Sequence, residues 1–212
     1  MGIGRQIKHF TSLVVPRWLL FRGRMAGRKV ALSFDDGPHQ EHSPRILDVL
    51  GQAGVKATFF VVGEEAEKYP ALVRRMLEEG HEVANHSYGH YALLDASPAD
   101  YLADVLHCQK VLEDICGCDL EKSFRPPYGS IPPLVFLKLI RLGFRTVFWS
   151  VDSDDSRVEE AGQLVERFSR KPLVSGDVVL LHEDYRHTLE ALPVLMDTVR
   201  QKGFDLVRCQ DL

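Results

Sequence analysis

Two pairs of residues in the first half of the chain have types and spacings that suit hydrolytic chemistry. Asp35 and Asp36 are adjacent, and Gly37 and Pro38 follow them and favour a turn. Adjacent carboxylates repel each other, so a divalent cation bound to one of them offsets the repulsion and leaves the other free to accept a proton. We therefore interpret this turn as a combined metal-ligand and base site.

The second pair, His86 and His90, is separated by four positions. One helical turn or a compact loop can direct both imidazoles at one metal ion. Two histidines and one carboxylate leave coordination positions for water and substrate, whereas a structural zinc site is filled by four protein ligands. The pattern predicts one divalent metal ion, with zinc as the first choice and cobalt, nickel or iron as alternatives. His81 is interpreted as a solvent-facing bystander.

Short β-rich segments alternate with helical periodicity from residue 29 onward, which is typical of βα units around a parallel sheet. The predicted strands span residues 30–34, 57–62, 82–85, 123–125, 146–151, 178–181 and 204–207. The predicted helices span residues 44–53, 66–79, 98–115, 133–142, 158–169 and 189–202. This α/β pattern predicts a distorted (β/α) barrel with about seven parallel strands, short of the usual eight units, and an open doubly wound sheet is the alternative.

Both architectures place active sites at the carboxyl ends of strands. The reactive residues that fall at or just after five of the predicted strands are Asp35, Asp36, His86, Arg125, Asp152, Asp155 and His182. Taken alone, each also suits a helix cap or an ordinary structural role. Their shared position at strand ends favours one common site.

Four short motifs in this order resemble those of the polysaccharide deacetylases, also called the NodB homology domain or carbohydrate esterase family 4. They are Phe-Asp-Asp-Gly-Pro at 34–38, His-Ser-Tyr-Gly-His at 86–90, Arg-Pro-Pro-Tyr at 125–128 and Leu-Leu-His at 180–182. The resemblance covers about residue 29 to the end of the chain and implies a NodB-type deacetylase barrel.

The resemblance also implies a role for each matching residue. It assigns the metal ligands to Asp36, His86 and His90. It makes Asp35 the base that accepts a proton from the attacking water, and His182 the acid that protonates the departing amine.

The remaining matches are implied to support these groups. Arg125 would pair with Asp35, and Asp155 would hold His182 in a donating orientation. Tyr128, through its backbone N–H, would stabilise the oxyanion, and Leu180 is assigned with it to substrate binding.

One motif departs from the family pattern. The family's Asp-x-x-Asp-Trp reads Asp-Ser-Asp-Asp-Ser at residues 152–156, so Ser156 stands where the tryptophan is expected. We expect this change to open or reshape one wall of the pocket, and we do not assume that Trp149 replaces the missing indole. Asp152 and Asp154 are interpreted as loop acids without a catalytic role.

These residues predict a metal-dependent hydrolase, and the resemblance implies that it removes the N-acetyl group from an N-acetylglucosamine-type sugar in a polysaccharide, an oligosaccharide or a lipid-linked glycan precursor. The alternatives are a deformylase of a lipid-linked amino sugar, an acetyl-ester hydrolase, and a non-catalytic glycan-binding module. The intact set of Asp35, His86, His90 and His182 argues against the module.

Composition is consistent with one globular domain, because the 212 residues are 45% hydrophobic and 26% charged. Residues 1–29 carry seven basic side chains and no acid, while the remaining 19 basic and 30 acidic side chains give −11. We predict a basic, apolar arm at residues 1–28 and a catalytic domain at residues 29–212. Nucleic acid is not an expected partner, because the positive charge is confined to the arm and no nucleic-acid motif occurs.

The arm and the cysteines bear on localisation. The apolar stretch at residues 10–21 is interrupted by Pro16 and Arg17 and is too short to span a bilayer, and no clear secretory signal is present. We expect a cytoplasmic protein whose arm either contacts the inner face of a bacterial membrane or packs on the domain. Four irregularly spaced cysteines are too few for a disulfide framework and suit a reducing compartment.

Overall fold

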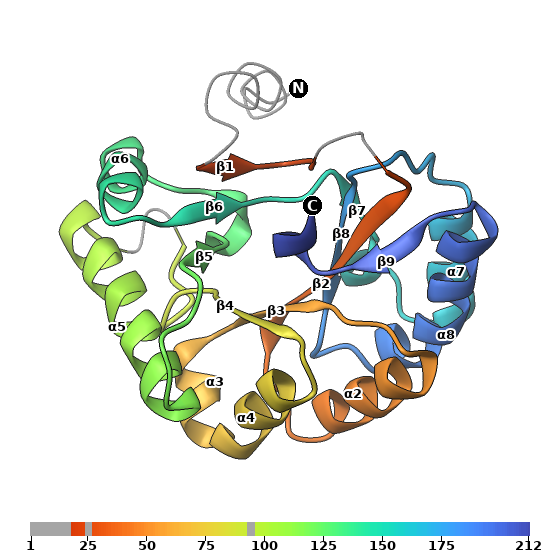
Figure 1. The fold of residues 1–212 in the computed structure, drawn as a ribbon, viewed down its shortest axis with the longest axis horizontal. Coiled ribbons are helices and arrows are strands. Elements are labelled where there is room, and N and C mark those ends of the chain that lie inside the picture. The colour runs from red at the N-terminus through yellow and green to blue at the C-terminus, as the bar shows by residue number, and fades with distance from the viewer. Residues whose placement is uncertain (1–17, 24–26, 93–95) are drawn as a thin grey trace.

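The computed structural model describes residues 18–23, 27–92 and 96–212. Its centre is a curled parallel sheet with helices around the outside (Figure 1). The strands are β1 (Leu19–Leu20), β2 (Lys29–Gly37), β3 (Thr58–Val61), β4 (Glu82–Asn85), β5 (Ser123–Phe124), β6 (Arg145–Val147), β7 (Val151–Asp152), β8 (Val178–His182) and β9 (Asp205–Val207). The helices are α2 (His42–Ala53), α3 (Gly63–Lys68), α4 (Pro70–Glu78), α5 (Pro98–Cys116), α6 (Pro133–Arg141), α7 (Ala161–Ser169) and α8 (Arg186–Gln201).

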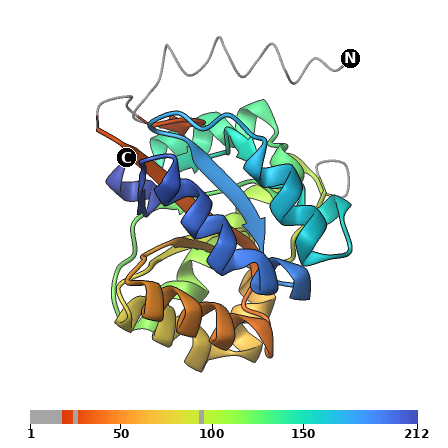
Figure 2. The same ribbon diagram turned by 90° about the vertical axis from the view of Figure 1, so that its right-hand side faces the viewer.

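The sheet runs in the order β1-β6-β5-β4-β3-β2-β8-β7, and β9 pairs with the beginning of β2. Every pairing between these strands is parallel. Since β1 and β7 stand at opposite ends of the order, the sheet is an incomplete barrel. Figure 2 shows α8 beside α7 and α2 on the side of β8. The predicted distorted α/β barrel is confirmed.

Alternation along β2 sorts its side chains between two environments. Val30, Leu32 and Phe34 belong to the large core between the sheet and the helices. Ala31 belongs to a smaller cluster inside the barrel, and Ser33 lies on the same side of the strand as Ala31. Because side chains alternate along a strand, Asp35 lies on the same inner side as Ala31 and Ser33, near the carboxyl end of β2.

Two predicted elements are each divided in the structure. The predicted helix at 66–79 is interrupted at Tyr69, because Pro70 has no N–H and forces the residue before it out of the helical conformation. The predicted strand at 146–151 becomes β6 and β7. The carbonyls of Val147, the last residue of β6, and of Phe148, the residue after it, accept hydrogen bonds from Arg125, so this backbone is directed into the barrel.

The described end of the predicted arm packs on the barrel. Leu19 and Leu20 are buried and form β1 beside β6, and Arg22 Nε lies 2.7 Å from Asp177 Oδ1. Residues 1–17, which include Phe10, Leu13, Val14 and three of the arm's basic side chains, lie outside the described residues, so the membrane hypothesis for them stays a prediction. No helix within the described part of the chain is long and apolar enough to cross a membrane.

The C-terminal residues close the end of the barrel where the strands begin. The turn η3 (Cys209–Asp211) buries Cys209, whose N–H donates to Thr58 Oγ1 at the start of β3. The next N–H, from Gln210, donates to Glu82 at the start of β4. The opposite end, where the strands finish, is the one available for a site.

Candidate active site

Asp35 is fixed by an ion pair inside the barrel. Arg125 Nη1 lies 2.6 Å from Asp35 Oδ1, and the Arg125 side chain is completely buried. The guanidinium also donates to Ser33 Oγ and to the carbonyls of Val147 and Phe148, and it lies over the Phe60 ring. Because each nitrogen of the guanidinium donates a hydrogen bond, the guanidinium is held in one orientation, and its bond to Oδ1 orients the Asp35 carboxylate.

Asp36 departs from the alternation of β2. In a regular strand two adjacent side chains point to opposite faces. Here the β2–β3 register shifts between Phe34 and Gly37, and Asp36 has φ of 68°, in the left-handed region that aspartate tolerates better than most residues. This backbone turns Asp36 toward the histidines that follow β4, so both carboxylates serve one site.

The two histidines converge on Asp36. His86 Nε2 and His90 Nε2 lie 3.3 and 3.1 Å from Asp36 Oδ1. His86 Nδ1 donates to the Arg125 carbonyl at 2.8 Å, which leaves Nε2 as the free nitrogen. The loop between the histidines is held by Asp104, which accepts the N–H groups of Tyr88 and Gly89.

The three side chains fit a divalent metal ion. One ligand atom from each of Asp36, His86 and His90 lies within 4.8 Å of the others. Asp36 Oδ1 is buried and receives no hydrogen bond of good geometry, so it is an acceptor without a donor. Burial opposes the charge of Asp36, but the two imidazoles outweigh burial and lower the pKa of this carboxyl. The chemistry of this donor set suits zinc and other first-row ions.

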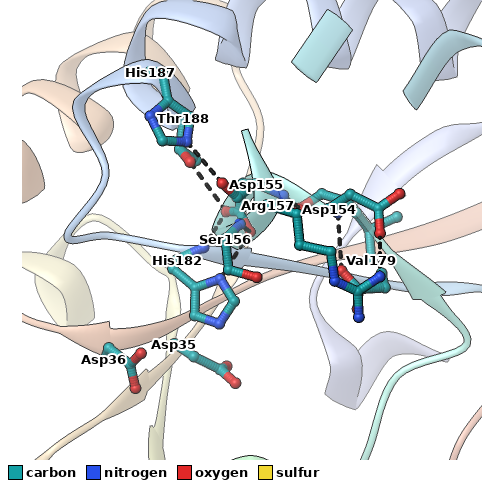
Figure 3. A network of polar contacts seen from close by, with 12 residues as sticks. Asp35, Asp36, Asp154, Asp155, Ser156, Arg157, Val179, His182, His187 and Thr188 are labelled. Carbon is teal, nitrogen blue, oxygen red and sulfur yellow. Dashed lines mark hydrogen bonds and ion pairs between the residues drawn. The ribbon is translucent and has the colours of Figure 1, made fainter. Parts of the chain in front are cut away.

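His182 ends β8 and belongs to a hydrogen-bonded pair with Asp155 (Figure 3). His182 Nδ1 donates to Asp155 Oδ1, and the His182 N–H donates to Oδ2, both at 2.8 Å. Burial by itself lowers the pKa of His182, but the hydrogen bond and the charge of Asp155 outweigh burial and raise it to about 9. His182 is therefore a protonated donor at neutral pH, and its ring lies between Asp155 and the two aspartates of β2 in Figure 3.

Two residues of α8 complete the support of Asp155. Thr188 Oγ1 donates to Asp155 Oδ2 at 3.0 Å, and His187 Nε2 donates to the Asp155 carbonyl at 2.8 Å. Burial raises the pKa of Asp155, but its hydrogen bonds and the charge of His182 outweigh burial and lower it. Neither supporting residue follows from the motifs, because only the packing of α8 brings them to Asp155.

The two predicted substrate-binding residues are Tyr128, beside His90, and Leu180, in β8. Tyr128 is 67% exposed, has φ of 56°, and its ring centroid lies 4.9 Å from that of His90. Leu180 is buried in β8 and lies on the same side of the strand as His182. Their roles in binding stay predictions.

The position of the expected tryptophan is occupied by a small polar residue. Ser156 N–H donates to Asp155 Oδ1, and the ring beside His182 belongs to Tyr185, with a centroid distance of 5.7 Å. Trp149 lies elsewhere, 5.8 Å from the Arg125 guanidinium carbon. Asp154 pairs with Lys171 outside the site, in agreement with its interpretation as a loop acid.

The expectation for His81 is wrong. The sequence predicts a solvent-facing residue, but His81 is 2% exposed, accepts the Ala57 N–H at Nδ1, and meets the Phe59 ring edge-on. Burial lowers the pKa of His81 to about 4. A polar residue just before a strand does not reveal that neighbouring elements cover it. Ser33, which accepts a hydrogen bond from Arg125, is a site residue that the motifs do not include. Its position two residues before Asp35, on the same side of β2, is the feature of the sequence that indicates it.

A model of the polysaccharide deacetylase family matches residues 22–147, more than half of the chain. The chain belongs to the polysaccharide deacetylase family. This confirms the resemblance carried by the motifs, including those at Asp35, Asp36, His86, His90 and Arg125, which lie within the matched residues.

Named relatives of this deacetylase-family chain act on acetylated glycans. It is 34% identical over 185 residues to a peptidoglycan-N-acetylglucosamine deacetylase of Listeria monocytogenes, covering 87% of this chain but only 39% of that protein. It is 36% identical over 196 residues to a chitooligosaccharide deacetylase of Bradyrhizobium, covering 84% and 88% of the two chains. A crystal structure of a peptidoglycan N-acetylglucosamine deacetylase aligns with a TM-score of 0.87 at 32% identity, over 95% of each chain.

Proposed function

We propose that this chain is a metal-dependent hydrolase that removes the N-acetyl group from an N-acetylglucosamine-containing glycan. The observation that carries the proposal is the meeting of three groups at the carboxyl ends of the strands: the donor set of Asp36 and two histidines, the Asp35–Arg125 pair, and the His182–Asp155 pair. The names of the relatives support an acetylated amino sugar as the substrate.

Asp36, His86 and His90 would hold the metal ion. When bound, a divalent ion there polarises the acyl carbonyl and lowers the pKa of water. Zinc is the ion that we propose, because histidine nitrogens and one carboxylate are its common ligands at hydrolytic sites.

Asp35 would accept the proton of the attacking water, and Arg125 keeps its carboxylate aligned for that step. As the water oxygen bonds to the acyl carbon, the backbone N–H of Tyr128 would stabilise the oxyanion. His182, protonated and held by Asp155, would give a proton to the sugar nitrogen as the carbon–nitrogen bond breaks. The products are acetate and a free amine.

We further propose that an oligosaccharide or a lipid-linked precursor is the physiological form of the substrate. The basic and apolar composition of residues 1–17 supports a reaction close to an anionic membrane surface on the cytoplasmic side. A peripheral contact of this kind needs no membrane-spanning helix.

The test is release of acetate and formate from N-acetylglucosamine oligomers, peptidoglycan fragments and lipid-linked amino sugars, with zinc or cobalt added. Acetate release by the wild type that disappears in Asp35→Asn supports the proposal and identifies the preferred form of the substrate. Release of formate without acetate overturns deacetylation in favour of deformylation. A folded, metal-loaded protein that releases neither acid overturns the enzymatic proposal.

A further inference from the structure

Glu183 follows His182 and has no part in the mechanism above, although it is completely buried beside the site. One carboxyl oxygen, Oε2, accepts a hydrogen bond from Ser43 Oγ at the start of α2. The other, Oε1, is buried without a hydrogen-bond partner. Burying a carboxyl group with incomplete hydrogen bonding costs free energy. The contacts of the Glu183 carboxyl indicate what this buried group does.

The Glu183 carboxyl packs directly against Gly37, the residue after Asp36. A Cβ atom at Gly37 would clash with Oε1, Cδ and Oε2 of Glu183. Gly37 is not among the glycines with positive φ, so the close approach of Glu183, rather than the backbone conformation, requires glycine here. The Glu183 side chain therefore occupies the space that shapes the turn after Asp35 and Asp36.

Backbone contacts attach Glu183 to the same turn. Its N–H donates to the Asp35 carbonyl at 3.1 Å, and its own carbonyl accepts from His42 Nδ1 at 3.1 Å. Ser43 Oγ, which donates to Glu183, also accepts the His39 N–H at 2.7 Å. One residue at the end of β8 thus connects the end of β2 with the beginning of α2.

We propose that Glu183 is a positioning residue: its buried carboxyl, packed on Gly37 and bonded to Ser43, fixes the turn that directs Asp36 toward the metal ion and holds Asp35 beside it. The left-handed backbone of Asp36 needs such support, because a regular strand would point the two side chains to opposite faces. Burial, the largest effect, and the nearby acids raise the pKa of Glu183 to about 8, so a neutral amide of the same shape suits the position.

The test compares Glu183→Ala with the isosteric Glu183→Gln. The readouts are the dissociation constant for zinc, measured by competition with a chelating dye, and the visible absorption spectrum of the cobalt-loaded protein. Glu183→Ala should weaken zinc binding about tenfold, the lower end of the loss usual for groups that orient metal ligands, and should change the cobalt spectrum. Glu183→Gln should restore affinity to within about threefold of the wild type, since it keeps the shape.

Glu82 provides a matched control at the opposite end of the barrel. It is 4% exposed, and like Glu183 it has one oxygen bonded to a hydroxyl and one oxygen without a partner. Glu82→Ala should lower the free energy of unfolding but leave zinc affinity and the cobalt spectrum unchanged. An equal loss of zinc affinity in Glu82→Ala and Glu183→Ala would overturn the positioning role, and so would wild-type affinity in Glu183→Ala.

If Glu183→Ala does not fold, Ser43→Ala removes only the hydroxyl, and unchanged metal affinity and spectrum in that variant would overturn the inference. The inference rests on the proposed function for the identity of the metal site, whereas its readouts, zinc affinity and the cobalt spectrum, need no substrate. The expected pattern of metal affinities together with an inactive wild type would therefore overturn the proposed reaction and support the role of Glu183.

Discussion

Asp35 and His182 are register partners on the adjacent parallel strands β2 and β8, so the proposed base and acid lie side by side at the same edge of the sheet. Neighbouring parallel strands are about 4.8 Å apart, and partner side chains project to the same face. Each residue is then held by its own opposite charge, Asp35 by Arg125 and His182 by Asp155. The sheet therefore sets the spacing of the two groups, and the ion pairs set their orientation.

Replacing Asp35 by asparagine should abolish most of the activity while the protein still binds metal. The amide keeps the shape of the side chain but cannot accept the proton, so we expect kcat to fall about 100- to 10,000-fold. Zinc content and kcat are measured on the same preparation. Asp152 is interpreted from the sequence as a loop acid, but it ends β7 and lies outside the metal set. Asp152→Asn should retain wild-type kcat, and a small effect of Asp35→Asn would reassign the base.

Replacing Asp155 by asparagine should move the alkaline limit of activity to lower pH. The pKa of His182 is raised from 6.5 to about 9, so the donating form persists up to about pH 9 and is lost above it. Without the charge of Asp155, the effect of burial dominates and the pKa of His182 falls. The measurement is kcat/KM against pH, and Asp154→Asn is the control because Asp154 pairs with Lys171 outside the site. An unmoved alkaline limb in Asp155→Asn would contradict His182 as the acid.

Removing the metal should abolish activity reversibly. Dialysis against a chelator should give an inactive protein that zinc or cobalt restores. His90→Ala deletes one of three protein ligands, so its zinc affinity should fall by at least about 100-fold, beyond the usual effect of outer-shell groups. His107→Ala is the control, since His107 is exposed on α5 and contacts Tyr88 rather than the metal set. Full activity after chelation, with metal absence verified by elemental analysis, would exclude metal dependence.

Replacing Arg125 by methionine should destabilise the fold as well as the site. Asp35 would be left buried without its partner, which typically costs about 3–5 kcal/mol of unfolding free energy. Urea denaturation measures the change. Lys110→Met breaks an exposed pair on α5, whose side chains are 70% and 65% exposed, and should cost only about 0.5 kcal/mol.

A double-mutant cycle tests whether the charge of Asp35 is the reason for that cost. If it is, adding Asp35→Asn to Arg125→Met should recover part of the lost stability, because no uncompensated charge then remains. Strictly additive losses would instead attribute the effect to the hydrogen bonds of Arg125 with Ser33 and the carbonyls between β6 and β7.

The sequence by itself determines the fold class and the place of the site. Apolar periodicity is local information, and parallel strands bring their carboxyl ends to one edge, so Asp35, His86 and His182 could be placed together before any coordinates. The motifs also indicate which aspartate belongs with which partner. The structure brings Asp36, His86 and His90 together and pairs Arg125 with Asp35 and Asp155 with His182.

The tertiary structure decides what depends on contacts between distant segments. At the break between β6 and β7, Arg125, the residue after β5, donates hydrogen bonds to the carbonyls of Val147 and Phe148. The burial of His81 and the support of Asp155 by Thr188 come from packing of elements separated along the chain. Glu183 directly follows the motif at 180–182, and it is the tertiary structure that buries it against Gly37. Periodicity reports which face of an element is apolar, whereas burial of a polar group depends on what the rest of the chain places over it.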